Sequence, residues 1–92
     1  MRKVTEQILH AFLNRKQKKI GNTFCDGDSV YLYGNKIVTR NRVSGVVFIR
    51  NAGWNTPTTR ERLNAFTSKR VQNKDYRLML DGKPWNGDWT EA

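Results

Sequence analysis

The sequence has one cysteine and one histidine among its 92 residues, and it has no long apolar run. A lone Cys25 cannot form a disulfide within the chain, and Cys25 with His10 does not supply the ligands of a tetrahedral zinc site. Because no segment has the length and apolar character of a signal peptide or a membrane span, we expect no membrane partner and a cytoplasmic protein. The sequence predicts neither a metal nor another cofactor.

Acidic residues are also scarce, at 8 against 17 lysines and arginines, which gives a formal net charge of +9. A strongly basic balance is the usual electrostatic footprint of a nucleic-acid partner, since bound cations release the counterions of phosphates. The excess lies in residues 1–19 and 57–79, whereas residues 80–92 carry more acids than bases. The alternatives are a soluble surface of high net charge or, with an exposed apolar face beside the bases, a membrane surface.

Enzymatic chemistry has little support in the sequence. The chain is expected to form a single domain over residues 1–92, too small for a cavity-lined site with a small-molecule substrate. Asp26 and Asp28 form a DxD pair that a Mg²⁺-dependent nuclease would need, but Asp26-Gly27 is also a standard hairpin turn, which is the interpretation favoured here. The serines lack a positioned histidine, and Cys25 lies between apolar neighbours, so no catalytic residue is predicted.

The first twenty residues predict an amphipathic helix that is capped by Thr5. Its apolar arc contains Val4, Ile8, Leu9, Ala11, Phe12 and Leu13, with His10 on the opposite, solvent-facing side. The basic run Arg15-Lys16-Gln17-Lys18-Lys19 is expected to close this helix before Gly21, where cations suit the negative end of the helix dipole. Four bases exceed what a helix end needs, so the same side chains are candidates for phosphate contacts.

Residues 22–51 change to a period of two, with Asp26-Gly27 and Gly34-Asn35 as turns, which predicts an antiparallel meander. Tyr31 and Tyr33 share one face of a strand. With Arg40, Arg42 and Arg50 on neighbouring strands, they would form an open face on which bases stack. The alternative is cross-strand aromatic packing that needs no ligand.

A second helix is predicted to begin in Thr56-Pro57-Thr58-Thr59, with two competing caps. Thr58 and Glu61 stand in capping-box register, and Thr56 followed by Pro57 is the other option. The buried stripe would be Thr59, Leu63 and Phe66. Arg60 and Arg62 would lie on the first turns, beside free N–H groups where a bound phosphate offsets their charge, unless Glu61 and the cap already compensate them.

The C-terminal segment predicts one more strand over residues 76–80 and turns at Asp81-Gly82 and Asn86-Gly87. The expected fold class is α+β, with a three- to four-stranded antiparallel sheet, two helices on one face, and a terminal strand or hairpin.

The string Gly-Trp-x-Thr-x-Thr-Thr-x-x-Arg-Leu-Asn over Gly53–Asn64 is the most specific motif in the chain. With a Gly-Asn-Thr start at Gly21 and a Tyr-Gly-Asn-Lys-Ile hairpin, residues 21–64 resemble a family of small phage-encoded proteins without an assigned enzymatic activity. The closing Trp-Asn-Gly-Asp-Trp is similar to such proteins as well. The resemblance implies a phage or prophage origin, and hence action in the cytoplasm of a host cell.

A short, basic, single-domain phage protein is also similar in size and character to anti-CRISPR inhibitors. The leading hypothesis is therefore a non-catalytic inhibitor that blocks target binding by a host CRISPR surveillance complex of protein and guide RNA. The alternative is a free DNA- or RNA-binding accessory protein of phage replication or transcription. A double-stranded-RNA-binding domain ranks third, because its lysine cluster is missing at the start of the second helix. The expected binding residues are Arg15, Lys16, Lys18, Lys19, Arg60, Arg62, Lys69 and Arg70.

Overall fold

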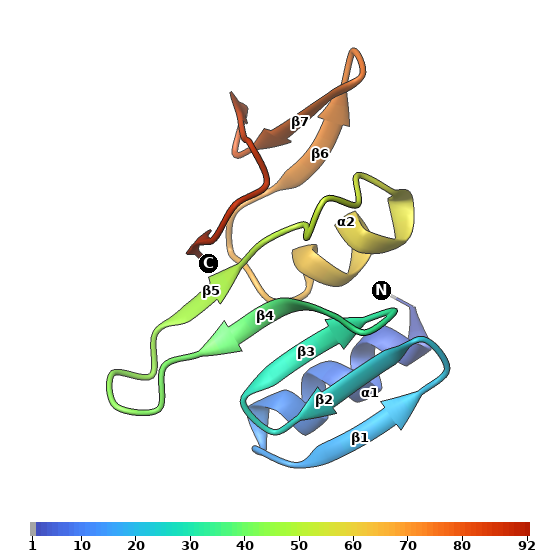
Figure 1. Cartoon of the computed structure of the whole chain (residues 1–92), viewed down its shortest axis with the longest axis vertical. Coiled ribbons are helices and arrows are strands. Elements are labelled where there is room, and N and C mark those ends of the chain that lie inside the picture. The colour runs from blue at the N-terminus through green and yellow to red at the C-terminus, as the bar shows by residue number, and fades with distance from the viewer. Residues whose placement is uncertain (1) are drawn as a thin grey trace.

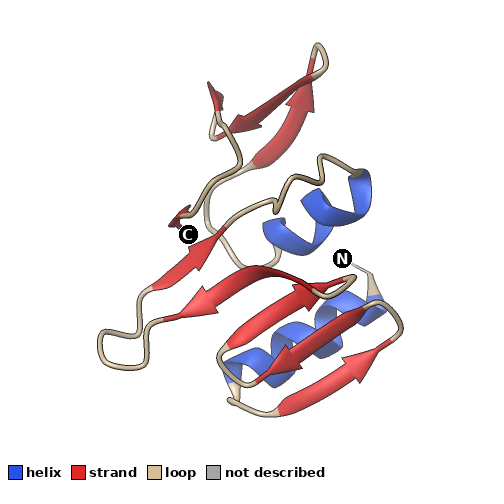
Figure 2. Cartoon of the chain, viewed as in Figure 1, coloured by secondary structure: helices blue, strands red, loops and turns tan. Residues whose placement is uncertain are grey.

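The computed structural model describes residues 2–92, which fold into two helices and nine strands arranged as two antiparallel sheets (Figures 1 and 2). The helices are α1 (Lys3–Leu13) and α2 (Pro57–Asn64). The larger sheet has six strands in the order β1-β2-β3-β4-β5-β9. Its strands are β1 (Gln17–Ile20), β2 (Thr23–Asp26), β3 (Ser29–Leu32), β4 (Asn35–Arg40), β5 (Val47–Ile49) and β9 (Thr90–Glu91). The smaller sheet has three: β6 (Val71–Lys74), β7 (Arg77–Leu80) and β8 (Lys83–Pro84).

The predicted sheet of three or four strands is therefore wrong. Residues 17–20, expected to close a helix, instead form the edge strand β1 and pair with β2. The end of the chain adds β9 beside β5, with Phe48 opposite Glu91. Residues 71–84 form a sheet of their own rather than extending the first one. Each of these pairings rests on backbone hydrogen bonds, which the side-chain pattern of an exposed, lysine-rich or two-residue strand does not show.

The first helix ends earlier than predicted because the chain turns at Arg15. The Arg15 N–H donates to the Phe12 carbonyl (3.2 Å) and the Lys16 N–H to the Ala11 carbonyl (2.9 Å), the bonds of a Schellman motif. Arg15 holds the left-handed conformation (φ 55°) that glycine usually supplies there. The proposed Thr5 cap is also wrong, since the helix begins at Lys3 and Thr5 is fully buried within it.

One apolar core joins both helices to both sheets. Helix α1 packs on β1, β2 and β3, and Figure 1 shows it behind these strands, while α2 packs against β6. The rings of Phe12 and Phe66 meet edge to face with centroids 5.3 Å apart. The buried apolar residues are Ile8, Ala11, Phe12, Cys25, Val30, Leu32, Ile37, Val38, Ile49, Leu63, Phe66 and Val71.

Thr56 caps the second helix, so the second of the two predicted caps is correct. The Thr56 hydroxyl accepts from the Thr59 N–H (3.2 Å), and Pro57 occupies the first turn. The buried stripe of Thr59, Leu63 and Phe66 is confirmed, with exposed fractions of 1%, 0% and 9%.

The hairpin between β6 and β7 turns through two residues that both have positive φ, Asp75 (52°) and Tyr76 (63°). Such a turn favours glycine at the second position, as in the Asp81-Gly82 turn of the next hairpin. Tyr76 is 97% exposed, so its ring has little packing to offset the backbone cost. Tyr76 therefore destabilises the hairpin of the smaller sheet.

Replacing Tyr76 with glycine is expected to stabilise the protein by about 0.5–1 kcal/mol. A residue with a Cβ in the left-handed backbone region costs ~1–2 kcal/mol, and glycine removes that cost. Part of this gain is lost because glycine gives the unfolded chain more conformational freedom. The midpoint of urea unfolding should rise with an unchanged slope. Tyr76→Ala, which keeps a Cβ, is the control and should gain less; a fall in stability with glycine would reveal a stabilising contact of the ring.

In the part of the chain that the structure describes, neither helix has the length and apolar character needed to cross a membrane.

Candidate nucleic-acid interface

Four side chains form a continuous row across the larger sheet. Lys19 on β1 stands opposite Phe24 on β2, Phe24 opposite Tyr31 on β3, and Tyr31 opposite Lys36 on β4. Directly opposed residues lie on one face of an antiparallel sheet, so a lysine stands at each end of an aromatic pair. The next residues of these strands, Cys25, Val30 and Leu32, are buried, which places the row on the face away from the core. We call Lys19, Phe24, Tyr31 and Lys36 the aromatic–basic row.

The contacts within this row keep its aromatic rings ordered. The rings of Phe24 and Tyr31 stack with centroids 5.8 Å apart and an angle of 28° between their planes. The Lys36 Nζ lies 5.6 Å from the Tyr31 ring centre, and the Tyr31 hydroxyl donates to Asp26 Oδ2 at 3.3 Å. A shallow pocket beside the row is lined by Lys19, Gly21, Asn22, Phe24, Tyr31, Tyr33 and Gly34. The Phe24–Tyr31 contact is the cross-strand aromatic packing given above as the alternative, so that part of the interpretation is confirmed. The pocket beside the pair, with Lys19 in its lining, is the open part of this surface.

Tyr33 belongs to this surface, although it is not in the strand. The sequence placed the turn at Gly34-Asn35, but β3 ends at Leu32 and the turn residues are Tyr33 and Gly34. Tyr33 takes a positive φ of 50° and is 69% exposed. It nevertheless lines the same pocket as Phe24 and Tyr31.

The three arginines predicted to share the tyrosine face do not lie in that pocket. The Arg40 side chain is 7% exposed and lies over the Phe12 ring, 3.9 Å from its centre. Arg42 pairs with Asp28 (2.7 Å). Arg50 donates to the Lys36 carbonyl (2.6 Å) and stacks on Trp89. Their predicted role beside the tyrosines is wrong, because Arg40 packs on Phe12, Arg42 binds Asp28, and Arg50 is held by the Lys36 backbone and Trp89.

Three predicted lysines are exposed at the edge strand β1: Lys16 just before it, and Lys18 and Lys19 within it. Only Lys19 points to the aromatic face, since Lys18 stands opposite Cys25, on the core side of the sheet. Arg15 is held at 3.3 Å from Asp28, which also binds Arg42. The predicted N-terminal cations therefore lie along one edge of the sheet, and of these only Lys19 belongs to the row.

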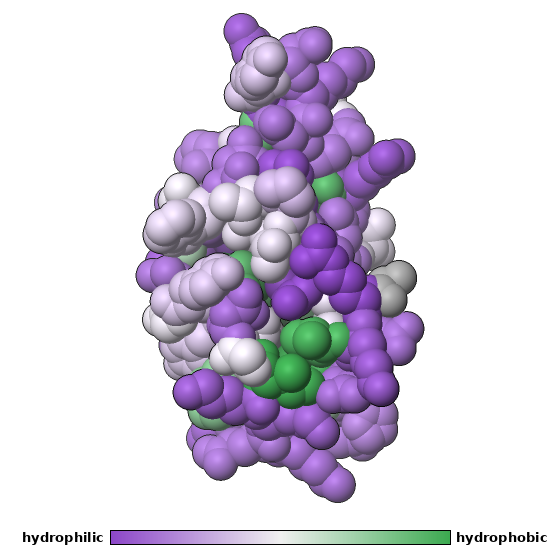
Figure 3. Space-filling view, turned by 90° about the vertical axis from the view of Figure 1, so that its right-hand side faces the viewer, coloured by the Kyte–Doolittle hydropathy of each residue, from purple (hydrophilic) through white to green (hydrophobic). Residues whose placement is uncertain are grey.

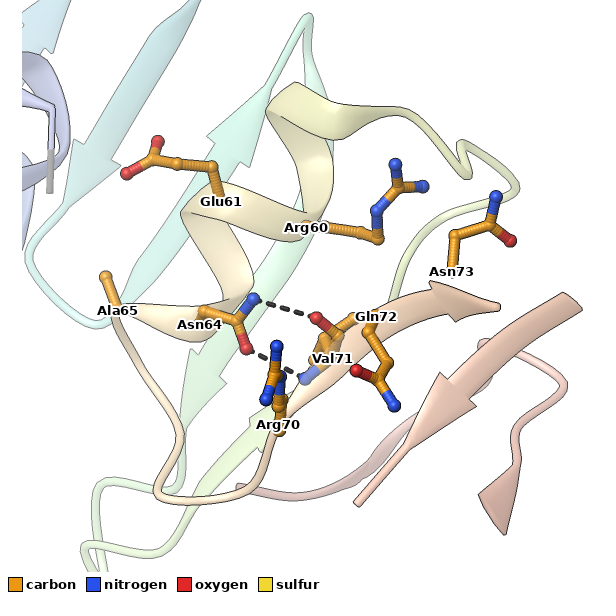
Figure 4. Close-up of a pocket in the computed structure, with 8 residues that line it drawn as sticks. All are labelled: Arg60, Glu61, Asn64, Ala65, Arg70, Val71, Gln72 and Asn73. Carbon is orange, nitrogen blue, oxygen red and sulfur yellow. Dashed lines mark hydrogen bonds between the residues drawn. The ribbon is translucent and has the colours of Figure 1, made fainter. Parts of the chain in front are cut away.

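Arg60 and Arg70 both line a second, polar pocket between α2 and β6, and Glu61 lines it as well (Figure 4). Arg60 donates to the side-chain oxygen of Asn55 (2.6 Å). The Asn64 side chain holds the pocket wall in place by bonding the N–H (2.8 Å) and carbonyl (2.9 Å) of Val71. Two arginines on a rigid wall suit a phosphate group. The structure thus places two of the predicted binding residues in one pocket, which we call the arginine pocket.

Arg62, expected on the surface, is buried with an exposed fraction of 4%. Its guanidinium donates to Thr5 Oγ1 (2.8 Å) and Thr23 Oγ1 (3.2 Å) and pairs with Glu61. Burial alone would raise the pKa of Glu61, but hydrogen bonds from Thr5, from the Arg2 N–H and from Arg62, with the Arg62 charge, hold it below its usual value. The predicted exposure of Arg62 is wrong, and the alternative that Glu61 compensates its charge is confirmed. The sequence could not show this burial, because the partners Thr5 and Thr23 are distant along the chain.

The last predicted cation, Lys69, lies beyond α2 and donates to the backbone carbonyl of Glu91 (3.0 Å). It helps to hold the C-terminal strand.

The sequence did not identify Phe24, Lys36 and Trp54 as surface residues of the site. The cross-strand register that aligns Phe24 and Lys36 with Tyr31 was the missing signal.

The DxD pair serves as a turn and an ion-pair centre. Asp26 Oδ1 accepts from the Asp28 N–H (3.1 Å) and the Ser29 N–H (2.8 Å), which confirms the turn interpretation.

Burial raises the pKa of the Cys25 thiol, while the Gly27 N–H bonded to its sulfur opposes the shift. A raised pKa disfavours the reactive thiolate.

The fold and this surface define a small, basic α+β protein with an open aromatic and cationic sheet face. A family model described as Kyanoviridae Gp96 protein matches residues 1–91, so the chain belongs to this family of phage proteins. The predicted phage origin is confirmed. No curated protein and no solved structure matches the chain.

Proposed function

We propose that this phage protein is a non-catalytic binder of single-stranded RNA or DNA and that the aromatic–basic row is its contact surface. The observation that carries the proposal is the direct alignment of Lys19, Phe24, Tyr31 and Lys36 across four strands. At about 4.8 Å per strand, the row spans roughly 14 Å. Over that length the row presents two aromatic rings, with a lysine at each end.

The chemistry of the row fits a single strand better than a duplex. Unpaired bases expose faces that stack on aromatic rings, each worth about 1–3 kcal/mol, whereas a duplex keeps its bases stacked inside. Lys19 and Lys36 stand where the phosphates on either side of the stacked bases can reach them. The net charge of +9 and the arginine pocket add attraction that depends on salt.

Inhibition of a host CRISPR surveillance complex is one setting in which the row would act. There the bound strand would be the guide or target nucleic acid of the complex. Membership of a phage protein family supports action in a host cell. The row supports nucleic-acid binding itself, whichever complex holds the strand. The setting is tested by tagged pull-down from host lysate with and without nuclease.

The double variant Lys19→Glu, Lys36→Glu is expected to weaken binding to a labelled 12-nucleotide single strand by about tenfold or more, roughly 1.4 kcal/mol. The plot of log affinity against log salt should lose about 1.4 units of slope, ~0.7 for each lysine that contacts a single-strand phosphate. Fluorescence anisotropy over a series of salt concentrations measures both quantities. Melting temperature should change little, since both residues lie on the solvent face.

The matched control is Lys74→Glu, Lys83→Glu, which changes the net charge equally but lies on the smaller sheet, where both residues are exposed. It should retain most of the affinity. Equal losses in the two double variants would mean that bulk charge, rather than the row, binds the strand. Tight binding to duplex and none to single strands would contradict the proposal outright.

A further inference from the structure

A third cavity lies at the β3–β4 end of the larger sheet, on the face opposite the row, and residues of the signature motif form part of its lining. It has a volume of about 510 Å³, and the β3–β4 turn, the loop after β5 and the start of α2 form its walls. Tyr33 and Trp54, 69% and 53% exposed, stand on its walls, while buried Leu32 and Ile37 form an apolar part of its lining. Asn35 and Thr58 supply polar groups. We call it the Tyr33–Trp54 pocket.

Buried backbone contacts fix the loop that carries Trp54. The Trp54 N–H donates to the Asn51 carbonyl (3.0 Å), and the Gly53 N–H donates to Asn51 Oδ1 (3.0 Å). Asn51 is itself buried and donates its N–H to the Gly87 carbonyl (2.9 Å). An exposed tryptophan on a loop held this firmly is presented in advance of binding, which lowers the entropy cost of contact with a ligand.

Tyr33 connects this pocket to the aromatic–basic row, since it lines both cavities. Figure 3 shows the side of the molecule toward which the β3–β4 turn and the start of α2 point in Figure 1. On that side, pale residues of intermediate hydropathy and a green apolar patch interrupt the hydrophilic surface. A strand bound at Phe24 and Tyr31 would therefore pass over Tyr33, around the β3–β4 turn, to reach the pocket on the other face.

We propose that the Tyr33–Trp54 pocket receives one unstacked base of a bound single strand, an inference that rests on the proposed function. A base has an apolar face for the rings and a polar edge for amide and hydroxyl groups, the two kinds of surface that this pocket combines. None of its described lining residues is charged, whereas Lys19 and Lys36 stand outside it on the row. Phosphates stay at the lysines, and the base enters the pocket.

The test uses the full chain and the single-stranded 12-mer. Binding should quench tryptophan fluorescence in the wild-type protein, and Trp54→Phe, which keeps an aromatic ring for folding, should lose most of that quenching. Trp54→Leu, which removes stacking but keeps an apolar side chain, should weaken affinity about five- to 150-fold, the range for one stacked base. Tyr76→Leu is the control, a more exposed aromatic (97% against 53%) in the β6–β7 turn of the smaller sheet, and should bind as wild type.

The outcomes separate this inference from the proposed function. If Trp54→Leu binds as wild type and quenching persists in Trp54→Phe, while Lys19→Glu, Lys36→Glu still weakens binding, the row binds the strand and the pocket proposal is overturned. If neither set of variants affects binding, both proposals fail. Quenching by a free nucleoside alone, without any loss of strand affinity in Trp54→Leu, would also overturn the inference.

Discussion

Replacing Arg62 with glutamate is expected to leave the protein unfolded or destabilised by about 3–5 kcal/mol. The guanidinium is buried, and it links Thr5 on α1, Thr23 on β2 and Glu61 on α2. Removing one partner of a buried pair leaves the other charge without compensation, and a second carboxylate beside Glu61 adds repulsion. Such a loss is a large fraction of the ~5–15 kcal/mol that stabilises a typical domain. Circular dichroism melts measure it.

Arg60→Glu on the same helix is the matched control. Arg60 lies in the open arginine pocket, so its reversal should shift the melting temperature by only a few degrees while altering binding. The Arg62 variant should melt more than ~12 °C below wild type, at about 4–8 °C per kcal/mol for a domain of this size. If both variants melted alike, the buried network would not contribute the stability inferred from its geometry.

Several features of the fold could be predicted because they depend on neighbours in sequence. The stripe of Thr59, Leu63 and Phe66 follows helical spacing, and all three are buried. The Asp26-Gly27 and Asp81-Gly82 turns follow from the preference of these residues for tight loops. Local spacing therefore predicts the core face of α2 and these two turns, although the turn expected at Gly34-Asn35 lies one residue earlier, at Tyr33-Gly34.

The sheet arrangement depends on contacts that local patterns do not record. Strand β1 is exposed along Gln17, Lys18 and Lys19, so it has no apolar alternation to reveal it. Arg15 ends α1 in a conformation for which glycine is the usual signal. Strand β9 exists only because Glu91 reaches Phe48, more than forty residues away. The strand count was therefore too low.

The candidate site was predicted in part, for the same reason. Tyr31 and Tyr33 were expected on an open face, and they line one pocket there. The cations beside them are Lys19 and Lys36 rather than the predicted arginines, and Lys36 stands opposite Tyr31 because the register across β3 and β4 shifts at an irregularity between Val30 and Tyr31. One such shift changes which residues stand opposite each other.

Gly87→Ala is expected to destabilise the protein by about 2–5 kcal/mol and to weaken strand binding as well. Gly87 is buried with φ of 83°, and a Cβ there would lie 2.5 Å from Cγ and 2.8 Å from Nδ2 of Asn51. The buried Asn51 side chain cannot move away without losing its bond to the Gly53 N–H. Overpacking costs ~1–3 kcal/mol, and the left-handed backbone adds ~1–2 kcal/mol.

Gly82→Ala separates the two contributions, since Gly82 has the same φ of 83° but nothing within 4 Å of the added Cβ. It should cost only the backbone term, ~1–2 kcal/mol, and leave binding unchanged. The excess cost of Gly87→Ala over Gly82→Ala then measures the packing of Asn51 against the C-terminal turn. Because Asn51 also holds the Trp54 loop, folded Gly87→Ala protein should bind the single strand more weakly, and equal melting temperatures for the two variants would refute this coupling.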